Sequence, residues 1–243
     1  MTGAREEILA RIRAAVGADG AAVAEGTGSA GETVAAGRAG SAAAAVDAAY
    51  AALPRPYLRS HHDPDETDIV ALFAERAADY RAFVERVPAA ELPGAVRGAV
   101  GTIRCANHGG IRLLVPGGLP GEWLSGLPDS VEVVRDEPLL PPDQLDLVSG
   151  VVTGCAAAIA ETGTVILDHG PGQGRRALTL VPDFHLVIVK AGQIAADLPD
   201  ALALLDQARP HTLVSGPSAT SDIELIRVEG VHGPRVLYIL IAD

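Results

Sequence analysis

Three short segments of the sequence place carboxyl, hydroxyl and imidazole groups beside glycines, a combination suited to acid–base chemistry or to binding a small anion. In the first, Glu161-Thr162-Gly163-Thr164 joins two apolar runs. This pattern predicts a β-hairpin with Gly163 at a positive φ and Glu161 at the tip of a sheet. Glu161 is either a candidate catalytic residue or a solvated turn acid of the kind common at loop tips.

The second segment, residues 215–224, reads SGPSATSDIE and follows the apolar run 212–214. Ser221 and Glu224 have the spacing of a capping box, which predicts a helix that begins where a strand ends. A helix N-terminus in that position binds anions in open α/β sheets, whereas the alternative is that the hydroxyls only cap the helix. The candidate anion-binding residues are Ser215, Gly216, Ser218, Thr220 and Asp222.

The third segment, residues 230–234, holds His232 in a tight loop before the last apolar run. An imidazole there is a candidate acid or base near neutral pH. His185 and His211 begin other apolar runs, and isolated histidines of this kind more often make structural hydrogen bonds. Because no histidine has a partner at metal-ligand spacing, we predict no metal site.

A glycine-rich stretch, residues 170–176, ends in Arg175 and Arg176. It lacks the Lys-Ser/Thr end of a P-loop and runs into an apolar segment instead of a helix, so neither a P-loop nor a Rossmann motif is indicated. It is either a solvated loop or a flexible hairpin loop that presents an arginine to an anion.

These segments are expected to converge in one cleft at the carboxyl edge of a sheet, where α/β proteins bind ligands. An anion there would be held by the backbone N–H groups of residues 218–222, with Arg175 or Arg176 closing over it. The hairpin adds Thr162, Gly163 and Thr164 to the candidate binding residues.

Composition excludes several classes of protein. The net charge of −12 and the scattered arginines argue against binding nucleic acid. The two cysteines, Cys105 and Cys155, are too few for an iron–sulfur cluster, which takes about four thiolates, and we expect no cofactor in this chain. The charged N-terminus and the lack of a run of about 18 apolar residues predict a cytoplasmic protein without a membrane span.

The N-terminal part, residues 1–53, is expected to hold an amphipathic helix at 5–16, an Ala/Gly-rich linker at 17–40 and an Ala-rich helix at 41–53. A single core follows over residues 54–243. Its first element is predicted as a long helix, capped at 63–66 and continuing through Phe73, Tyr80 and Phe83 to Val87.

Short Val/Ile/Leu-rich runs alternate with helices and Gly/Pro loops through the rest of the chain, which indicates a sheet buried on both faces with some antiparallel hairpins. The chain is therefore assigned to the α/β class. Helices are predicted at 96–103 and 198–206. Strands are predicted at 112–116, 131–135, 145–152, 164–167, 177–181, 185–190, 212–215 and 236–242.

Taken together, AIAETGT at 158–164, SGPS-x-T-x-DIE at 215–224 and GVHGP at 230–234 resemble the signature of the LUD-domain family, in its lactate-utilisation protein C group. The resemblance extends from about Tyr50 to the C-terminus. It implies a three-layer α/β fold with helices on both faces of the sheet, related to the group of glucosamine-6-phosphate deaminase, ribose-5-phosphate isomerase and CoA-transferases. It also implies a non-redox subunit of a system that oxidises L-lactate to pyruvate, in which two cysteine-rich partner proteins carry iron–sulfur clusters.

A second hypothesis is a stand-alone enzyme that acts on an anionic small molecule with Glu161 as nucleophile, as loop glutamates do in related folds. The two hypotheses differ in what the isolated chain does: the subunit needs partners, whereas the enzyme is active alone. A third, an interaction module, is disfavoured because no basic or aromatic patch is evident.

Overall fold

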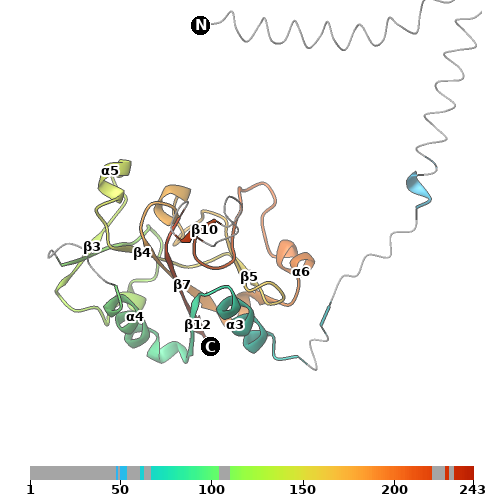
Figure 1. The fold of residues 1–243 in the computed structure, drawn as a ribbon, viewed down its shortest axis with the longest axis horizontal. Coiled ribbons are helices and arrows are strands. Elements are labelled where there is room, and N and C mark those ends of the chain that lie inside the picture. The colour runs from blue at the N-terminus through green and yellow to red at the C-terminus, as the bar shows by residue number, and fades with distance from the viewer. Residues whose placement is uncertain are drawn as a thin grey trace, which may run out of the picture. The chain divides into compact units, whose positions relative to one another are not determined.

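The computed structural model describes residues 48, 50–53, 61–62, 67–103, 110–220, 228–229 and 233–243, with the backbone alone at 219–220 and 228–229. Leu58–Asp243 forms one compact unit (Figure 1). The predicted helix at 5–16, the linker at 17–40, the cap at 63–66 and the helix start at 221–224 lie outside the described residues, and the domain boundary after residue 53 stays a prediction. None of the described helices has the length and apolarity needed to cross a membrane.

The core is a sheet of six strands in the order β1-β12-β7-β4-β2-β3, in which every neighbouring pair is parallel. Its central strands are buried on both faces, as their continuous Val/Ile/Leu sequences predicted, and the α/β class is confirmed. The strands are β1 (Phe83–Val87), β2 (Ile111–Leu114), β3 (Val131–Val134), β4 (Gly150–Thr153), β7 (Phe184–Lys190) and β12 (Val236–Ala242).

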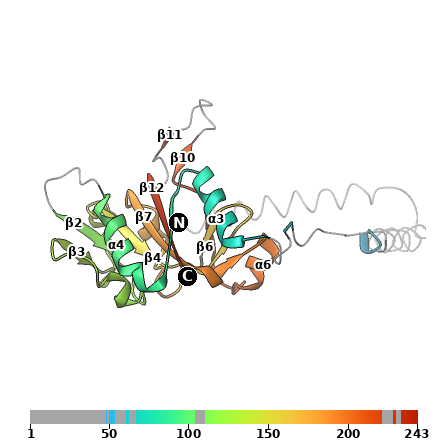
Figure 2. The ribbon, with the colours of Figure 1, turned by 90° about the horizontal axis from the view of Figure 1, so that it is seen from below.

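One face of this sheet is covered by helix α4 (Leu92–Gly101), which follows the turn η1 (Ala89–Glu91) (Figure 2). The turn η2 (Gly121–Leu124) packs Trp123 and Leu124 against the same core. Val96 and Val100 of the helix pack on Leu186 and Leu240 of the central strands. The predicted helix at 96–103 is thus present, but it begins and ends a few residues earlier.

The opposite face carries a second sheet as well as helices. This sheet has the order β8-β5-β6-β9 and is mixed, with β5 and β6 antiparallel. Val165 of the second sheet and Phe73 of helix α3 (Ile69–Asp79) share one core cluster with Val187 and Ile239 of the large sheet. Its strands are β5 (Ala157–Ile159), β6 (Thr164–Leu167), β8 (Ile194–Ala195), which follows the turn η4 (Ala191–Gln193), and β9 (Thr212–Val214).

Smaller elements complete the layers. Helix α5 (Pro142–Leu145) and the 3₁₀ helix η3 (Arg176–Thr179) pack Leu145 and Leu178 on the β2–β4 end of the large sheet. Helix α6 (Leu198–Ala203) covers the outer face of the second sheet. The strands β10 (Ala219–Thr220) and β11 (Val228–Glu229) pair with each other. Helices therefore lie on both faces of the large sheet, as predicted. The second sheet, which packs between the large sheet and helix α6, was not predicted.

The long helix predicted through Val87 is wrong beyond residue 79. Helix α3 ends at Asp79, Arg81 takes a φ of 68°, and residues 83–87 form the edge strand β1 beside β12. Phe83, placed by the prediction in the helix, is 60% exposed in β1 and stacks on Tyr238. The segment FVERV suits either structure locally, and the open edge of β12 decides in favour of a strand because it supplies backbone hydrogen bonds.

Two predicted strands are also corrected. Residues 177–181 do not form a strand, because residues 176–179 make the helix η3 and Leu178 turns into the core. The run predicted as a strand at 145–152 is divided, with Leu145 ending α5 and only residues 150–153 in β4. Short apolar runs carry no signal that distinguishes a strand from a buried helical turn.

Candidate functional site

The hairpin predicted around Glu161 is present. Strands β5 and β6 are antiparallel, and Gly163 has a φ of 58° in the turn between them. A Cβ atom on Gly163 would lie 2.4 Å from the backbone nitrogen of Ala77 in α3. Glycine is therefore required here twice, for its backbone conformation and for the close approach of the helix.

Glu161 pairs with a histidine that the sequence analysis had not singled out. Its carboxylate contacts Nε2 of His62, and this hydrogen bond is the main reason that the pKa of Glu161 is lowered. The neighbouring His61 pairs through Nδ1 with the buried carboxylate of Asp197 at 2.6 Å. The tip of the hairpin thus presents an ionised carboxylate that is already engaged in an ion pair or a hydrogen bond.

A chain of hydroxyl groups connects the hairpin to the segment after β9. The Oγ1 atoms of Thr162 and Thr164 lie 2.6 Å apart, and Thr164 Oγ1 lies 2.7 Å from Oγ of Ser215. Pairing of β6 with β9 brings these residues together. Thr162, Thr164 and Ser215, which were predicted to converge, therefore lie side by side.

A pocket of about 160 Å³ lies beside this hydroxyl chain. Its base is formed by the first residues of β7 and β12, and its walls by η3 and by the turn after β9. The lining residues include Arg176, Thr179, His185, Ser215, Ser218 and Leu237. The pocket thus opens at the amino edge of the parallel sheet, whereas the prediction placed the cleft at the carboxyl edge. The rule for parallel strands does not apply to β9, which belongs to the second sheet.

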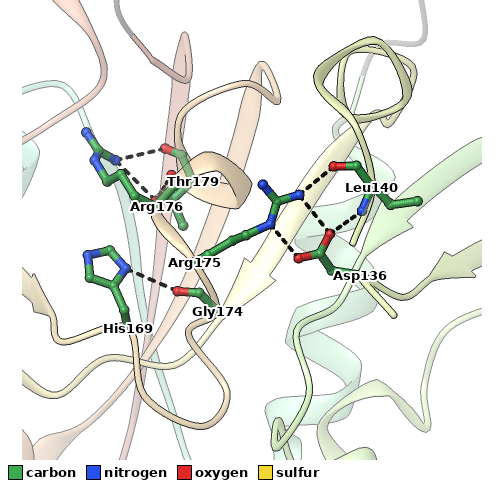
Figure 3. A network of polar contacts seen from close by, with 7 residues as sticks. All are labelled: Asp136, Leu140, His169, Gly174, Arg175, Arg176 and Thr179. Carbon is green, nitrogen blue, oxygen red and sulfur yellow. Dashed lines mark hydrogen bonds and ion pairs between the residues drawn. The ribbon is translucent and has the colours of Figure 1, made fainter. Parts of the chain in front are cut away.

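Arg176 supplies the positive charge of this pocket. Its guanidinium donates from Nη1 to Oγ1 of Thr179 at 3.2 Å and to the carbonyl oxygen of Thr179 at 3.5 Å (Figure 3). Among the described residues it has no carboxylate partner. His185 is 1% exposed and lies 2.8 Å through Nε2 from Oγ1 of Thr153. Burial, reinforced by the charge of Arg176, lowers the pKa of His185 to about 3, so this imidazole is neutral at physiological pH.

Arg175 has a different environment. Its guanidinium makes a two-pronged ion pair with Asp136, from Nε to Oδ2 at 2.8 Å and from Nη2 to Oδ1 at 3.0 Å, and also donates to the carbonyl oxygen of Leu140 (Figure 3). Asp136 accepts a further bond from the N–H of Leu140, and the pair with Arg175 lowers its pKa. Arg175 is thus committed to a structural contact and does not close over the amino-edge pocket.

The glycine-rich loop before these arginines is fixed by hydrogen bonds. Gly172 donates its N–H to the carbonyl oxygen of Gly117 at 2.8 Å. Nδ1 of His169 lies 3.1 Å from the carbonyl oxygen of Gly174 (Figure 3). Asp168 accepts from the N–H of Gly170 and from the side chain of Gln173. The interpretation of this loop as flexible is corrected, because its polar groups are paired.

The remaining predicted residues have mixed outcomes. The N–H of Ser218 donates to the carbonyl oxygen of Pro234 at 2.8 Å, so it is not the anion ligand that was predicted. Gly216 is buried at a φ of 81° in the pocket wall. Thr220 lies in β10, and Asp222 and His232 lie outside the described residues. Thr179 and His185 were missed as pocket residues, because their place follows from the packing of η3 and not from a motif.

The fold is that of an α/β protein, and its arginine- and hydroxyl-lined pocket between the parallel sheet and the second sheet is a candidate site for a small polar ligand. Residues 143–242 match the LUD domain. The chain is 48% identical over 178 residues to "Lactate utilization protein C" of Deinococcus radiodurans, covering 72% of this chain and 79% of that protein. It therefore belongs to the LUD-domain family, in the lactate utilization protein C group.

Further relatives agree with this placement. "Lactate utilization protein C" of Bacillus pumilus is 37% identical over 94 residues, covering 35% of this chain and 39% of that protein. The crystal structure of a DUF162 family protein from Deinococcus radiodurans is 41% identical and superposes with a TM-score of 0.59, covering 72% of this chain and 97% of that one.

Proposed function

We propose that this chain is the non-redox subunit of a lactate-utilisation system that oxidises L-lactate to pyruvate together with separate iron–sulfur proteins. The observation that carries the proposal is the 48% identity, over 178 residues, to a protein named for lactate utilization. The match spans 72% of this chain and 79% of that protein, so most of both chains are similar.

The small number of cysteines in the chain supports the placement of the redox centres on separate proteins. Oxidation of lactate releases two electrons, which need an acceptor. A cluster takes about four thiolates, and this sequence has two cysteines. Cys155 is buried, and burial raises the pKa of its thiol to about 12, which disfavours the thiolate that binds metals. Clusters are accordingly assigned to two cysteine-rich partners, and binding, positioning or assembly to this chain.

Deletion of the gene tests the proposal most directly. Growth on lactate as sole carbon source should be lost and should return with the wild-type gene on a plasmid, whereas growth on glucose is unchanged. The purified chain should be colourless and should reduce no dye with lactate until the cysteine-rich proteins are added. Normal growth of the deletion strain on lactate would remove the proposal.

The second candidate is a stand-alone enzyme of the fold group that includes CoA-transferases. The observation in its favour is the ionised Glu161 carboxylate, whose oxygen could attack an acyl thioester and release the CoA thiolate. The substitution Glu161→Gln separates the candidates. Under the subunit proposal the variant restores growth on lactate, whereas a covalent enzyme would lose its activity almost completely.

A further inference from the structure

The size of the amino-edge pocket limits its occupant to a small molecule. Its volume is about 160 Å³. Benzene occupies a cavity of about 150 Å³ in another protein, and lactate and pyruvate have as many non-hydrogen atoms as benzene. A coenzyme or a sugar phosphate is too large to be enclosed here.

The charge of the pocket favours an anion. Arg176 is exposed at the rim, and its planar guanidinium has N–H donors beyond the single one that contacts Thr179. A guanidinium binds a carboxylate through two parallel hydrogen bonds. Neutral His185 at the base adds no second charge, so the pocket suits a monoanion better than a dianion.

The remaining lining distinguishes two ends of the ligand. The hydroxyl groups of Thr179, Ser215 and Ser218 offer donors and acceptors to a hydroxyl or keto oxygen next to the carboxylate. Val214 and Leu237 provide an apolar wall for a short carbon chain. Polar groups that fix orientation within a partly apolar pocket are typical of small-molecule sites.

We propose that this pocket binds a short 2-hydroxy- or 2-oxocarboxylate, with Arg176 holding the carboxylate and the hydroxyl groups contacting the oxygen at carbon 2. The choice of lactate and pyruvate within this class rests on the proposed function. The chain binds the acid without changing it, and the bond-breaking step with its two electrons belongs to the partner proteins.

Calorimetry with the full chain and five probes tests the assignment: L-lactate, pyruvate, propionate, lactamide and inorganic phosphate. L-lactate or pyruvate should bind at millimolar concentration or better. Propionate lacks the oxygen at carbon 2 and lactamide lacks the charge, so each should bind at least about tenfold more weakly. Phosphate binding as tight as that of lactate would overturn the assignment in favour of an unspecific anion site.

The variant Arg176→Gln should weaken lactate binding at least about tenfold, and Arg176→Lys should recover only part of it because an ammonium lacks the planar fork. Arg235→Gln is the matched control. Arg235 lies just before β12 at the same edge of the sheet but faces Asp183 at 3.4 Å and does not line the pocket, so binding should stay within about twofold. Equal effects of both substitutions would show that only general surface charge matters.

Failure of the inference is distinguishable from failure of the proposed function. If the wild-type chain binds neither L-lactate nor pyruvate while the deletion strain fails to grow on lactate, the pocket assignment is wrong and the subunit role stands. Ser215→Ala should also weaken binding, and it serves as the test if Arg176→Gln does not fold. Unchanged affinity in a folded Arg176→Gln or Ser215→Ala variant contradicts the proposed contacts.

Discussion

Arg175 and Arg176 are adjacent in the sequence but belong to opposite edges of the large sheet. Arg175 points to the carboxyl edge, where Asp136 and the carbonyl oxygen of Leu140 accept its hydrogen bonds. Arg176 points to the amino edge, where Thr179 is its partner among the described residues. Two residues of the same type therefore have different roles: Arg175 stabilises the fold, whereas Arg176 supplies a positive charge to the pocket.

The pockets at the two edges differ in the same way. The carboxyl-edge pocket, about 520 Å³, is lined by Asp136, Glu137 and Arg175, so its single guanidinium is neutralised by a carboxylate. The amino-edge pocket is smaller, but its arginine faces no carboxylate in the described part of the chain. Although α/β sheets generally bind ligands at the carboxyl edge, the ligand site proposed above lies at the amino edge, where no described carboxylate pairs with Arg176.

The largest effect of a single substitution on stability at neutral pH is expected at the carboxyl edge. Asp136→Ala removes the acceptor of both Arg175 hydrogen bonds and of the Leu140 N–H, and it should lower the free energy of unfolding by about 2 kcal/mol. Urea unfolding of the full chain measures this change. A variant as stable as the wild type would mean that solvent replaces these contacts, and the contrast between the two arginines would disappear.

The pH dependence of stability should separate the two edges. His185 has a folded pKa near 3, below its unfolded value, so its contribution is complete above about pH 6.5 and falls as the pH drops, by roughly 1 kcal/mol for each pH unit. Asp136 also has a lowered pKa, from 3.8, so its contribution is lost only below about pH 4.

Unfolding curves between pH 7 and pH 3.5 test this difference. The substitution His185→Gln should flatten the loss of stability between pH 6.5 and pH 5, and Asp136→Asn should leave that interval unchanged. Should His185→Gln keep the full slope in this interval, other histidines would be responsible for it.

A smaller effect is expected when the available arginine is removed. Arg176→Gln should change the free energy of unfolding by no more than about 0.5 kcal/mol, because the residue is exposed and the hydroxyl of its buried partner Thr179 keeps its hydrogen bond to the backbone carbonyl oxygen of residue 176. The matched substitution Arg175→Gln leaves Asp136 without its cation and should cost clearly more. If both variants lost the same free energy of unfolding in urea, both arginines would be structural residues.

The smallest effect concerns a thiol in the core cluster that also holds Phe73 and Val187. Cys155 is buried and its thiol has a pKa near 12, so it should not react with a maleimide at pH 8 in the native chain. A Cys105→Ser background isolates this thiol, and mass spectrometry should find the label only after unfolding. Rapid labelling of the folded chain would show that the layers open at this core cluster.

Local sequence signals were sufficient for much of the fold. The strands at 164–167 and 236–242 match their predicted bounds because continuous Val/Ile/Leu runs suit a sheet buried on both faces. The turn at Gly163 was predictable because a glycine between two apolar runs can adopt a positive φ without steric strain. These inferences needed only the nearest neighbours in the chain.

Tertiary structure alone decided the rest. Residues 83–87 became a strand because the edge of β12 offered hydrogen bonds, and residues 176–179 became a helical turn because Leu178 fills a space between α5 and the large sheet. The different roles of Arg175 and Arg176 depend on Asp136, which is 39 residues away in the chain. Sequence patterns determine which residues are buried or able to ionise, but which groups meet is set by packing between distant segments.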